Sequence, residues 1–252
     1  MAGRALTVDM QDDDRLPAWQ TVIELAESGT GSNWTLVGGL MVAAHARRAG
    51  VLMGRPTDDV DALVDYAANR ASLIEARTVL ARLGFGLSRG DTFAYRFVHA
   101  DGRKIDVMIA DHLPSRMKPR LAQMPAFAAP AGEQAIRRRD IYRLEFRGGK
   151  HVEIGVPDEL GALVAKSAAF LVDNRDRGRH LDDSAVLLAC IEDASTLDYA
   201  SASSNDRKRI KATTDLLADE THPSWANLDE PDRRRGRLNV ILVRRALGIS
   251  TG

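Results

Sequence analysis

The most informative stretches of the sequence are VGG at residues 37–39 and RPTDDVD at residues 55–61. The glycines follow a short strand-like segment and precede a helix-like one, while Asp59 and Asp61 are two residues apart in a second strand-like segment. Because residues i and i+2 of a strand point to the same face, the two carboxylates are expected side by side. Such a pair repels unless a cation lies between the carboxylates or one is protonated. The pattern therefore predicts a Mg²⁺ site beside a glycine turn that admits phosphate.

Composition limits the class of protein. A chain of 252 residues can hold one large domain or two small ones, and 44% hydrophobic with 28% charged residues is ordinary for a globular protein. Lys+Arg and Asp+Glu both number 35, so net charge alone predicts no nucleic-acid partner. The single Cys190 excludes a disulfide framework and a cysteine-rich zinc site. With no membrane-length apolar run and an acidic start, we expect a cytoplasmic protein without a membrane partner.

Hydrophobic periodicity predicts alternating helices and strands before residue 157. The predicted elements are helices at 16–26, 40–49 and 67–83, strands at 34–37 and 59–64, and hairpins joining 93–98 to 104–109 and 141–146 to 151–154. Residues 114–130 are interrupted by prolines and are predicted to be a loop. This order predicts an α+β fold with a small mixed β-sheet and flanking helices.

The pattern becomes wholly helical after Pro157. The predicted helices cover residues 157–172, 181–191, 206–217 and 238–247. We therefore predict a catalytic core at residues 1–155, including an N-terminal helix within 1–30, and a C-terminal helical bundle at residues 156–252.

A third aspartate, Asp106, lies in the strand-like sequence KIDVMI at residues 104–109. The apolar residues on either side of Asp106 share one face of the strand, and Asp106 points to the other. A carboxylate there is costly to bury unless it is paired. If this strand lies beside residues 59–64, Asp106 joins the other two aspartates in a cluster that could bind two Mg²⁺ ions and deprotonate a hydroxyl. The alternatives for Asp106 are a salt bridge to an arginine or a solvated sheet edge.

This ordered set of residues resembles the core of the nucleotidyltransferase superfamily, which has a DNA polymerase β-like fold. The arginine, hydroxyl and paired acids in Arg55-x-Thr57-x-Asp59-Val60-Asp61 are most similar to those of the AbiEii/MenT type of toxin nucleotidyltransferases. The resemblance covers about residues 34–190.

The same family carries a lysine and an acid on C-terminal helices. They match Lys166 in KSAA at residues 166–169 and Asp183 in RHLDD at residues 179–183. His180 stands where the family usually has an acid. The resemblance implies that Lys166 contacts phosphate and that Asp183 positions Lys166 or an arginine. From the residues alone, Lys166 could equally extend to solvent, and Asp183 could simply suit the first turn of a helix.

The resemblance also implies roles for the residues of the first half. Asp59 and Asp61 would hold Mg²⁺, and Asp106 would bind a second metal ion or act as the base toward the acceptor hydroxyl. The nucleotide would be bound by Gly38, Gly39, Arg55 and Thr57 together with Lys166. Other interpretations remain for four of these positions. The glycines could serve a turn that needs positive φ, Thr57 could begin a strand, and Arg55 could be a surface residue before a proline.

The implied reaction transfers a nucleotide from an NTP to an acceptor. The family implies tRNA or another RNA as acceptor, a role as the toxin of a toxin–antitoxin pair that blocks translation, and a cognate antitoxin protein as partner. Clustered basic segments such as residues 116–120 could bind a polyanion, although each could also be a solvated surface. The alternatives are a small-molecule nucleotidyltransferase of the aminoglycoside-modifying type and a non-catalytic nucleotide-binding module.

Overall fold

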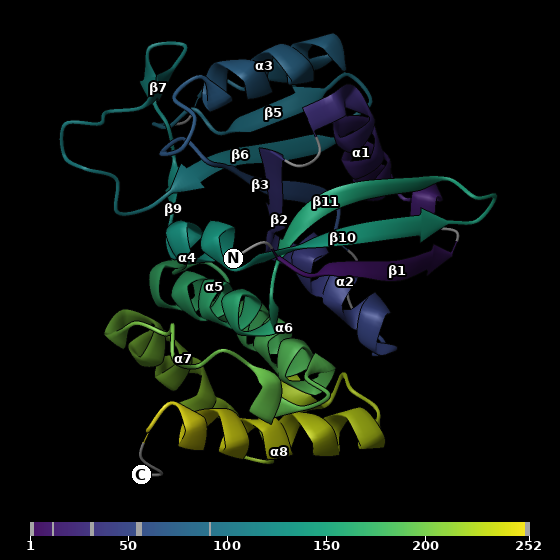
Figure 1. Ribbon diagram of the computed structural model, residues 1–252, viewed down its shortest axis with the longest axis vertical. Helices are drawn as coiled ribbons and strands as arrows, with labels where there is room; N and C mark the ends of the chain where they lie inside the picture. Colours follow the sequence, from purple (N-terminus) through teal and green to yellow (C-terminus); the bar gives the residue numbers. More distant parts are fainter. Residues whose placement is uncertain (1–2, 12, 31–32, 54–56, 91, 250–252) are drawn as a thin grey trace. The chain divides into compact units, whose positions relative to one another are not determined.

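The computed structural model describes residues 3–11, 13–30, 33–53, 57–90 and 92–249 (Figure 1). These residues form eight α-helices and a nine-stranded mixed sheet, together with a separate two-stranded pair. The strands are β1 (Ala5–Gln11), β2 (Trp34–Val37), β3 (Asp59–Val64), β4 (Phe85–Leu87), β5 (Arg96–His99), β6 (Lys104–Ala110), β7 (Arg120–Leu121), β8 (Met124–Pro125), β9 (Ala128–Ala129), β10 (Arg139–Phe146) and β11 (His151–Pro157). The predicted fold class, a mixed sheet with flanking helices, is confirmed.

The helices alternate with the strands before residue 157 and follow one another after it. They are α1 (Pro17–Leu25), α2 (Gly38–Ala49), α3 (Ser72–Arg82), α4 (Gly132–Arg137), α5 (Glu159–Val172), α6 (Arg177–Cys190), α7 (Ser204–Leu217) and α8 (Glu230–Ala246). Short helical turns occur at Asp13–Arg15, Ala26–Thr30, Ala194–Thr196 and Pro223–Trp225.

The sheet has the strand order β1-β10-β11-β2-β3-β6-β5-β4, and β9 also pairs with β6. At its centre, β3 runs antiparallel to β2 and parallel to β6, while β6 runs antiparallel to β5. The register places Asp61 opposite Val37 on one side and opposite Asp106 on the other. The sheet thus brings residues far apart in the sequence onto adjacent strands.

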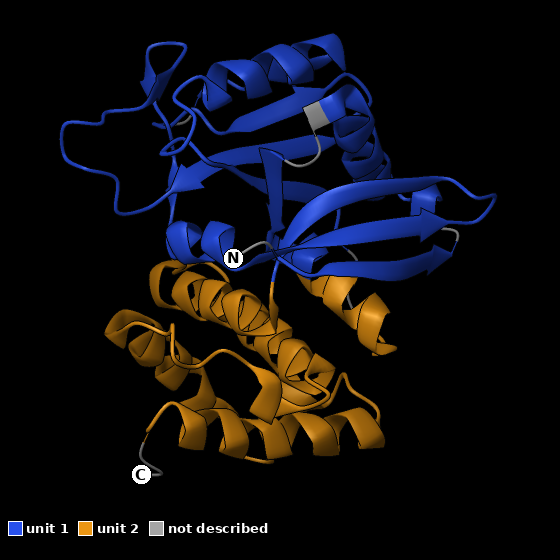
Figure 2. Ribbon diagram, viewed as in Figure 1, with its two compact units in different colours: residues 1–41, 57–157 blue, residues 42–56, 158–252 orange. Residues whose placement is uncertain are grey.

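The described chain divides into two compact units, which Figure 2 colours separately. The first comprises residues 1–41 and 57–157, and the second comprises residues 42–56 and 158–252. In the first unit, Val60, Ala62 and Val64 alternate with the aspartates of β3 and are buried. Helices α1 and α3 contact β3, and α4 contacts β2, β6 and β11.

The second unit is built around α5 and α6, which contact each other, while α5 also contacts α7 and α6 contacts α8. Gly236 of α8 lies against the ring of Trp225, and a Cβ at Gly236 would come within 2.7 Å of Cζ3 of that ring. Asn239 of α8 donates hydrogen bonds to the carbonyl oxygens of Leu188 and Ile191 at 2.9 and 2.7 Å. These bonds satisfy carbonyl groups at the C-terminal end of α6 that have no partner within the helix.

All predicted helices and strands are present, but several of their bounds differ. Helix α3 begins at Ser72 and not at residue 67, because the side chains of Asp65 and Asn69 accept hydrogen bonds from the backbone of Ala68 and Ala71. Such local bonds compete with helix formation. Helix α6 begins one turn before the predicted residue 181, where the side chain of Asp176 caps it.

Other differences concern the C-terminal helix and the proline-containing loop. Helix α8 begins two turns before the predicted residue 238, with Asp229 accepting a hydrogen bond from the backbone of Asp232 at 3.0 Å. Within residues 114–130, which we predicted to be a loop, the short strands β7, β8 and β9 form.

Besides these short strands, β1, β4 and α4 were also not predicted from the sequence. Strand β1 pairs in parallel with β10, and the Arg4 guanidinium beside it donates to the buried Asp140 carboxylate at 3.0 and 2.6 Å. The partners are 136 residues apart, so no local turn indicates this pairing.

Among the described residues, no helix combines the length and the apolar character that crossing a membrane requires.

Candidate functional site

The glycine turn and the paired acids, predicted as separate motifs, touch each other. Gly38 has a φ of +65° at the junction of β2 and α2, a conformation that residues with a Cβ rarely adopt. A Cβ at Gly38 would lie 1.8 Å from Oδ2 of Asp61. Glycine is therefore required there both for its backbone conformation and for the space that the carboxylate occupies.

The second glycine meets the other end of the acidic motif. A Cβ at Gly39, which is buried, would lie 2.6 Å from the hydroxyl oxygen of Thr57. Thr57 itself precedes β3 and is half-buried. Close packing against Thr57 gives Gly39 a role that the sequence did not indicate. Arg55, predicted to bind nucleotide, lies outside the described residues.

The three aspartates lie on the same face of two adjacent strands. Asp59 and Asp61 alternate with the buried residues of β3, and the parallel register pairs Asp61 directly with Asp106 of β6. Asp106 is buried, whereas Asp59 and Asp61 are half-buried. Asp58, of opposite parity, is exposed. The juxtaposition expected from strand parity is thus present, and the exposed Asp58 lies apart from it.

Arg96, which the sequence reasoning missed, holds the buried aspartate. It lies opposite Asp106 on β5, and its Nε and a terminal nitrogen donate to the two carboxylate oxygens at 2.8 and 2.7 Å. This hydrogen bonding to Asp106 raises the pKa of Arg96 above its usual range. Asp59 is approached by the same guanidinium at 3.9 Å and by the Lys104 ammonium at 3.8 Å. The structure therefore contains the salt bridge to an arginine that was one alternative for Asp106.

We tested whether these side chains fit Mg²⁺. In the part of the chain that the structure describes, no three or more His, Cys, Asp or Glu side chains are already gathered around a possible metal position. Two hydrogen bonds from Arg96 occupy the Asp106 carboxylate. The donors nevertheless have the chemistry that Mg²⁺ prefers, because they are carboxylates on one face of adjacent strands. The residues fit the ion if Asp106 exchanges Arg96 for it.

The lysine and acid of the C-terminal motif form a buried ion pair in the second unit. Lys166 of α5 and Asp183 of α6 have nearly inaccessible side chains, and the ammonium lies 2.7 Å from a carboxylate oxygen. The pairing agrees with the role that the resemblance implies for Asp183, positioning Lys166. It excludes the alternative in which the Lys166 ammonium extends to solvent.

His180 is buried on α6 near this pair. Its Nε2 lies 3.1 Å from Oδ2 of Asp173, and its Nδ1 has no hydrogen-bond partner among the described residues. Burial, reinforced by the charges of Lys166 and Arg179, lowers the pKa of His180. Backbone hydrogen bonding from Arg175, together with the bond to His180, lowers the pKa of Asp173 to about 2. His180, at the position where the resembled family has an acid, thus lies against Asp173, an acid in the loop between α5 and α6.

Comparison with known proteins bears on the fold. No family model matches the chain, and no curated protein matches it in sequence. The crystal structure of an antigenic nucleotidyltransferase-like protein from Paracoccidioides brasiliensis is similar, with a TM-score of 0.51 over 84% of this chain and 90% of that chain. The two sequences are 14% identical, so the likeness concerns the fold alone. The chain has a nucleotidyltransferase-like fold; the narrower AbiEii/MenT resemblance rests on the sequence motifs.

Proposed function

We propose that the protein is a Mg²⁺-dependent nucleotidyltransferase that transfers a nucleotide from an NTP to an acceptor and releases pyrophosphate. The observation that carries the proposal is the pairing of Asp61 with Asp106 on adjacent strands, directly beside the Gly38 turn. A nucleotidyltransferase-like fold supports the same reaction class. A phosphate-admitting turn and clustered carboxylates are the two parts that such chemistry needs.

The residues of the first unit have separate tasks in this proposal. Backbone N–H groups at Gly38 and Gly39 bind triphosphate oxygens at the N-terminus of α2, where the helix dipole favours anions. Thr57, packed against Gly39, orients a phosphate oxygen through its hydroxyl. Asp106 accepts the proton of the attacking hydroxyl after Arg96 releases its carboxylate.

Asp59, Asp61 and Asp106 are the residues that would hold Mg²⁺. When bound, the ion neutralises charge on the phosphates and on the departing pyrophosphate. Arg96 of β5 and Lys104 of β6, which approach Asp59, remain available to contact phosphate oxygens. Lys166, positioned by Asp183, is proposed as a further phosphate contact, as the resemblance implies.

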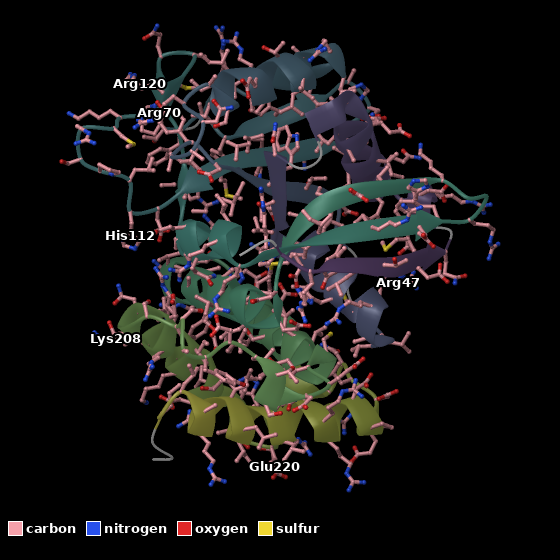
Figure 3. All side chains as sticks on the ribbon, in the orientation of Figure 1. Arg47, Arg70, His112, Arg120, Lys208 and Glu220 are labelled. Carbon is pink, nitrogen blue, oxygen red and sulfur yellow. The ribbon has the colours of Figure 1, made fainter. Side chains whose placement is uncertain are left out.

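We propose an RNA acceptor, with tRNA as the principal candidate, and a role as a translation-blocking toxin with a cognate antitoxin. The support is the resemblance of the motifs to AbiEii/MenT toxins. The loop between β6 and β7 adds exposed basic side chains at Arg116 and Lys118, and Arg120 of β7 is labelled in Figure 3. Such groups can bind phosphates of a nucleic acid. An aminoglycoside-type enzyme would instead need an acidic acceptor pocket.

The test is transfer of label from each of the four NTPs, with Mg²⁺, to total tRNA and to other RNA. Asp59→Asn should lower the rate at least ~100-fold, because metal coordination contributes several kcal/mol to such reactions. Asp58→Asn is the matched control: its carboxylate is adjacent but exposed and on the opposite face, so activity should persist. Label on no acceptor with any NTP would contradict transferase activity.

If expression is toxic, Asp61→Asn should relieve the toxicity.

A further inference from the structure

A cluster of accessible aromatic side chains lies next to Arg96, the residue that binds Asp106. The ring centroid of Phe127 is 5.7 Å from that of Phe93, in an edge-to-face arrangement, and 5.5 Å from that of Tyr95. We refer to Phe93, Tyr95 and Phe127 as the aromatic platform. The guanidinium carbon of Arg96 lies 5.6 Å from the Tyr95 ring centroid, so one arginine contacts both the platform and Asp106.

The platform is accessible, unlike the main aromatic residues of the core. Trp34, Tyr142 and Phe97 are fully buried, whereas 40% of Phe93 is exposed and the other two platform residues are half-buried. Exposing large aromatic surface in a group is unfavourable in water unless a ligand covers it. A flat ligand that covers the rings beside Arg96 would account for this exposure.

Backbone hydrogen bonds fix the platform in place. The carbonyl oxygen of Tyr95 accepts a bond from Val107 N at 2.7 Å, and that of Phe127 accepts one from Ile109 N at 3.0 Å. Both donors belong to β6, the strand that carries Asp106. The rings are thus attached to the same rigid strand as the acid, and little ordering would be required when a flat ligand binds.

Resting on the proposed function, we propose that the aromatic platform stacks a nucleobase of the bound substrate. Aromatic rings beside an arginine are the usual surface for unpaired bases, because every base has a flat π-face. Stacking is tolerant of base identity, and it would hold a nucleotide with its phosphates toward the carboxylates. The base could belong to the NTP or to a single-stranded RNA acceptor, since both present the same chemistry.

Phe93→Trp provides a direct test that does not depend on transfer activity. The three native tryptophans, Trp19, Trp34 and Trp225, are buried and give a constant background. Fluorescence of the new tryptophan should be quenched on titration with an NTP, with a single-stranded RNA oligonucleotide, or with both; whichever quenches identifies the source of the base. Inorganic triphosphate, which lacks a base, should not quench. Ile74→Trp, at an exposed site on α3, is the control for collisional quenching.

A second variant, Phe93→Leu, keeps an apolar side chain but cannot stack. It should raise the Kd for the quenching ligand, or its KM in transfer, by roughly tenfold, as expected for the loss of one stacked base, with kcat nearly unchanged. Phe93→Tyr should restore wild-type binding. Absence of quenching by both ligands, or equal quenching of Ile74→Trp, would overturn the proposal. Quenching without transfer would contradict the proposed function and leave the platform intact, whereas transfer with a normal KM in Phe93→Leu would contradict only the platform.

Discussion

Arg96 donates two parallel hydrogen bonds to Asp106 from the directly opposite position on the neighbouring strand, at 2.8 and 2.7 Å. A fork-shaped contact of this kind is among the stronger polar interactions in proteins. When no metal ion is bound, the Arg96 guanidinium supplies the positive charge that lies against the carboxylates. The Mg²⁺ binding that we propose at Asp106 would therefore exchange one cation for another.

Arg96→Gln should make the protein less stable and more responsive to Mg²⁺. Without metal, the buried Asp106 loses its partner, which should cost about 1–3 kcal/mol of unfolding free energy. Added Mg²⁺ should raise the Tm of the variant more than that of the wild type, because Arg96 no longer competes. Thermal unfolding with and without Mg²⁺ measures both effects. Arg103→Gln, which removes bonds to Asp101 and Glu24 elsewhere in the same unit, should lose stability without a larger metal response.

Gly38→Ala should destabilise the protein and abolish nucleotide transfer, because the new Cβ would overlap the Asp61 carboxylate. Gly50→Ala separates the cost of the left-handed backbone from the cost of the overlap with Asp61. Gly50 has nearly the same φ, +69°, but nothing lies within 4 Å of a Cβ there. The control should lose about 1–2 kcal/mol for the left-handed backbone alone, and Gly38→Ala about 1–3 kcal/mol more. Denaturant unfolding measures the difference, and equal losses would contradict the clash.

Lys166→Met should lower the free energy of unfolding by about 3–5 kcal/mol, because it leaves the Asp183 carboxylate buried and unpaired. The double variant Lys166→Met/Asp183→Leu removes both charges and should recover most of the stability. Transfer activity then distinguishes the roles of the pair. If Lys166 contacts phosphate, the stable double variant remains inactive; recovery of activity along with stability would show that the pair acts only in folding.

The stability of the protein should fall as pH decreases from 7 to 5, in part through His180. Burial lowers its pKa in the folded state, while the unfolded state takes up a proton near the ordinary value of 6.5. Below pH 6.5 the unfolded state therefore binds more protons and becomes favoured. The Asp173 carboxylate stays ionised in this range because its pKa is about 2. His180→Gln should reduce the pH dependence of the unfolding free energy, and an unchanged slope would contradict the assignment.

Much of the site was predictable because it depends on short-range rules. Strand parity alone places Asp59 and Asp61 on one face and separates Asp58 from them, and the structure agrees on all three. Asp106 was also found by parity. The prediction that its strand lies beside the other acids needed only one assumption about strand order, which the parallel pairing of β3 with β6 confirms.

Arg96 was missed although a signal for it existed. The predicted hairpin ends its two strands at residues 98 and 104, and counting two residues away from each end pairs Arg96 with Asp106. The contacts of Gly38 with Asp61 and of Gly39 with Thr57 could not be counted in this way, because they depend on the packing of a turn against a neighbouring strand. Strand β1 was missed because its partner lies far along the chain.

That distant partner has a consequence for how the protein is made. During synthesis β1 leaves the ribosome well before β10, whose Asp140 is 136 residues beyond Arg4. Until then the buried positions of β1, Val8 and Met10, have no strand beside them, and an unpaired strand edge invites association with other chains. The sheet can be completed only after most of its other strands exist. One edge of the sheet is thus finished late, and the newly made chain is most vulnerable to aggregation during that interval.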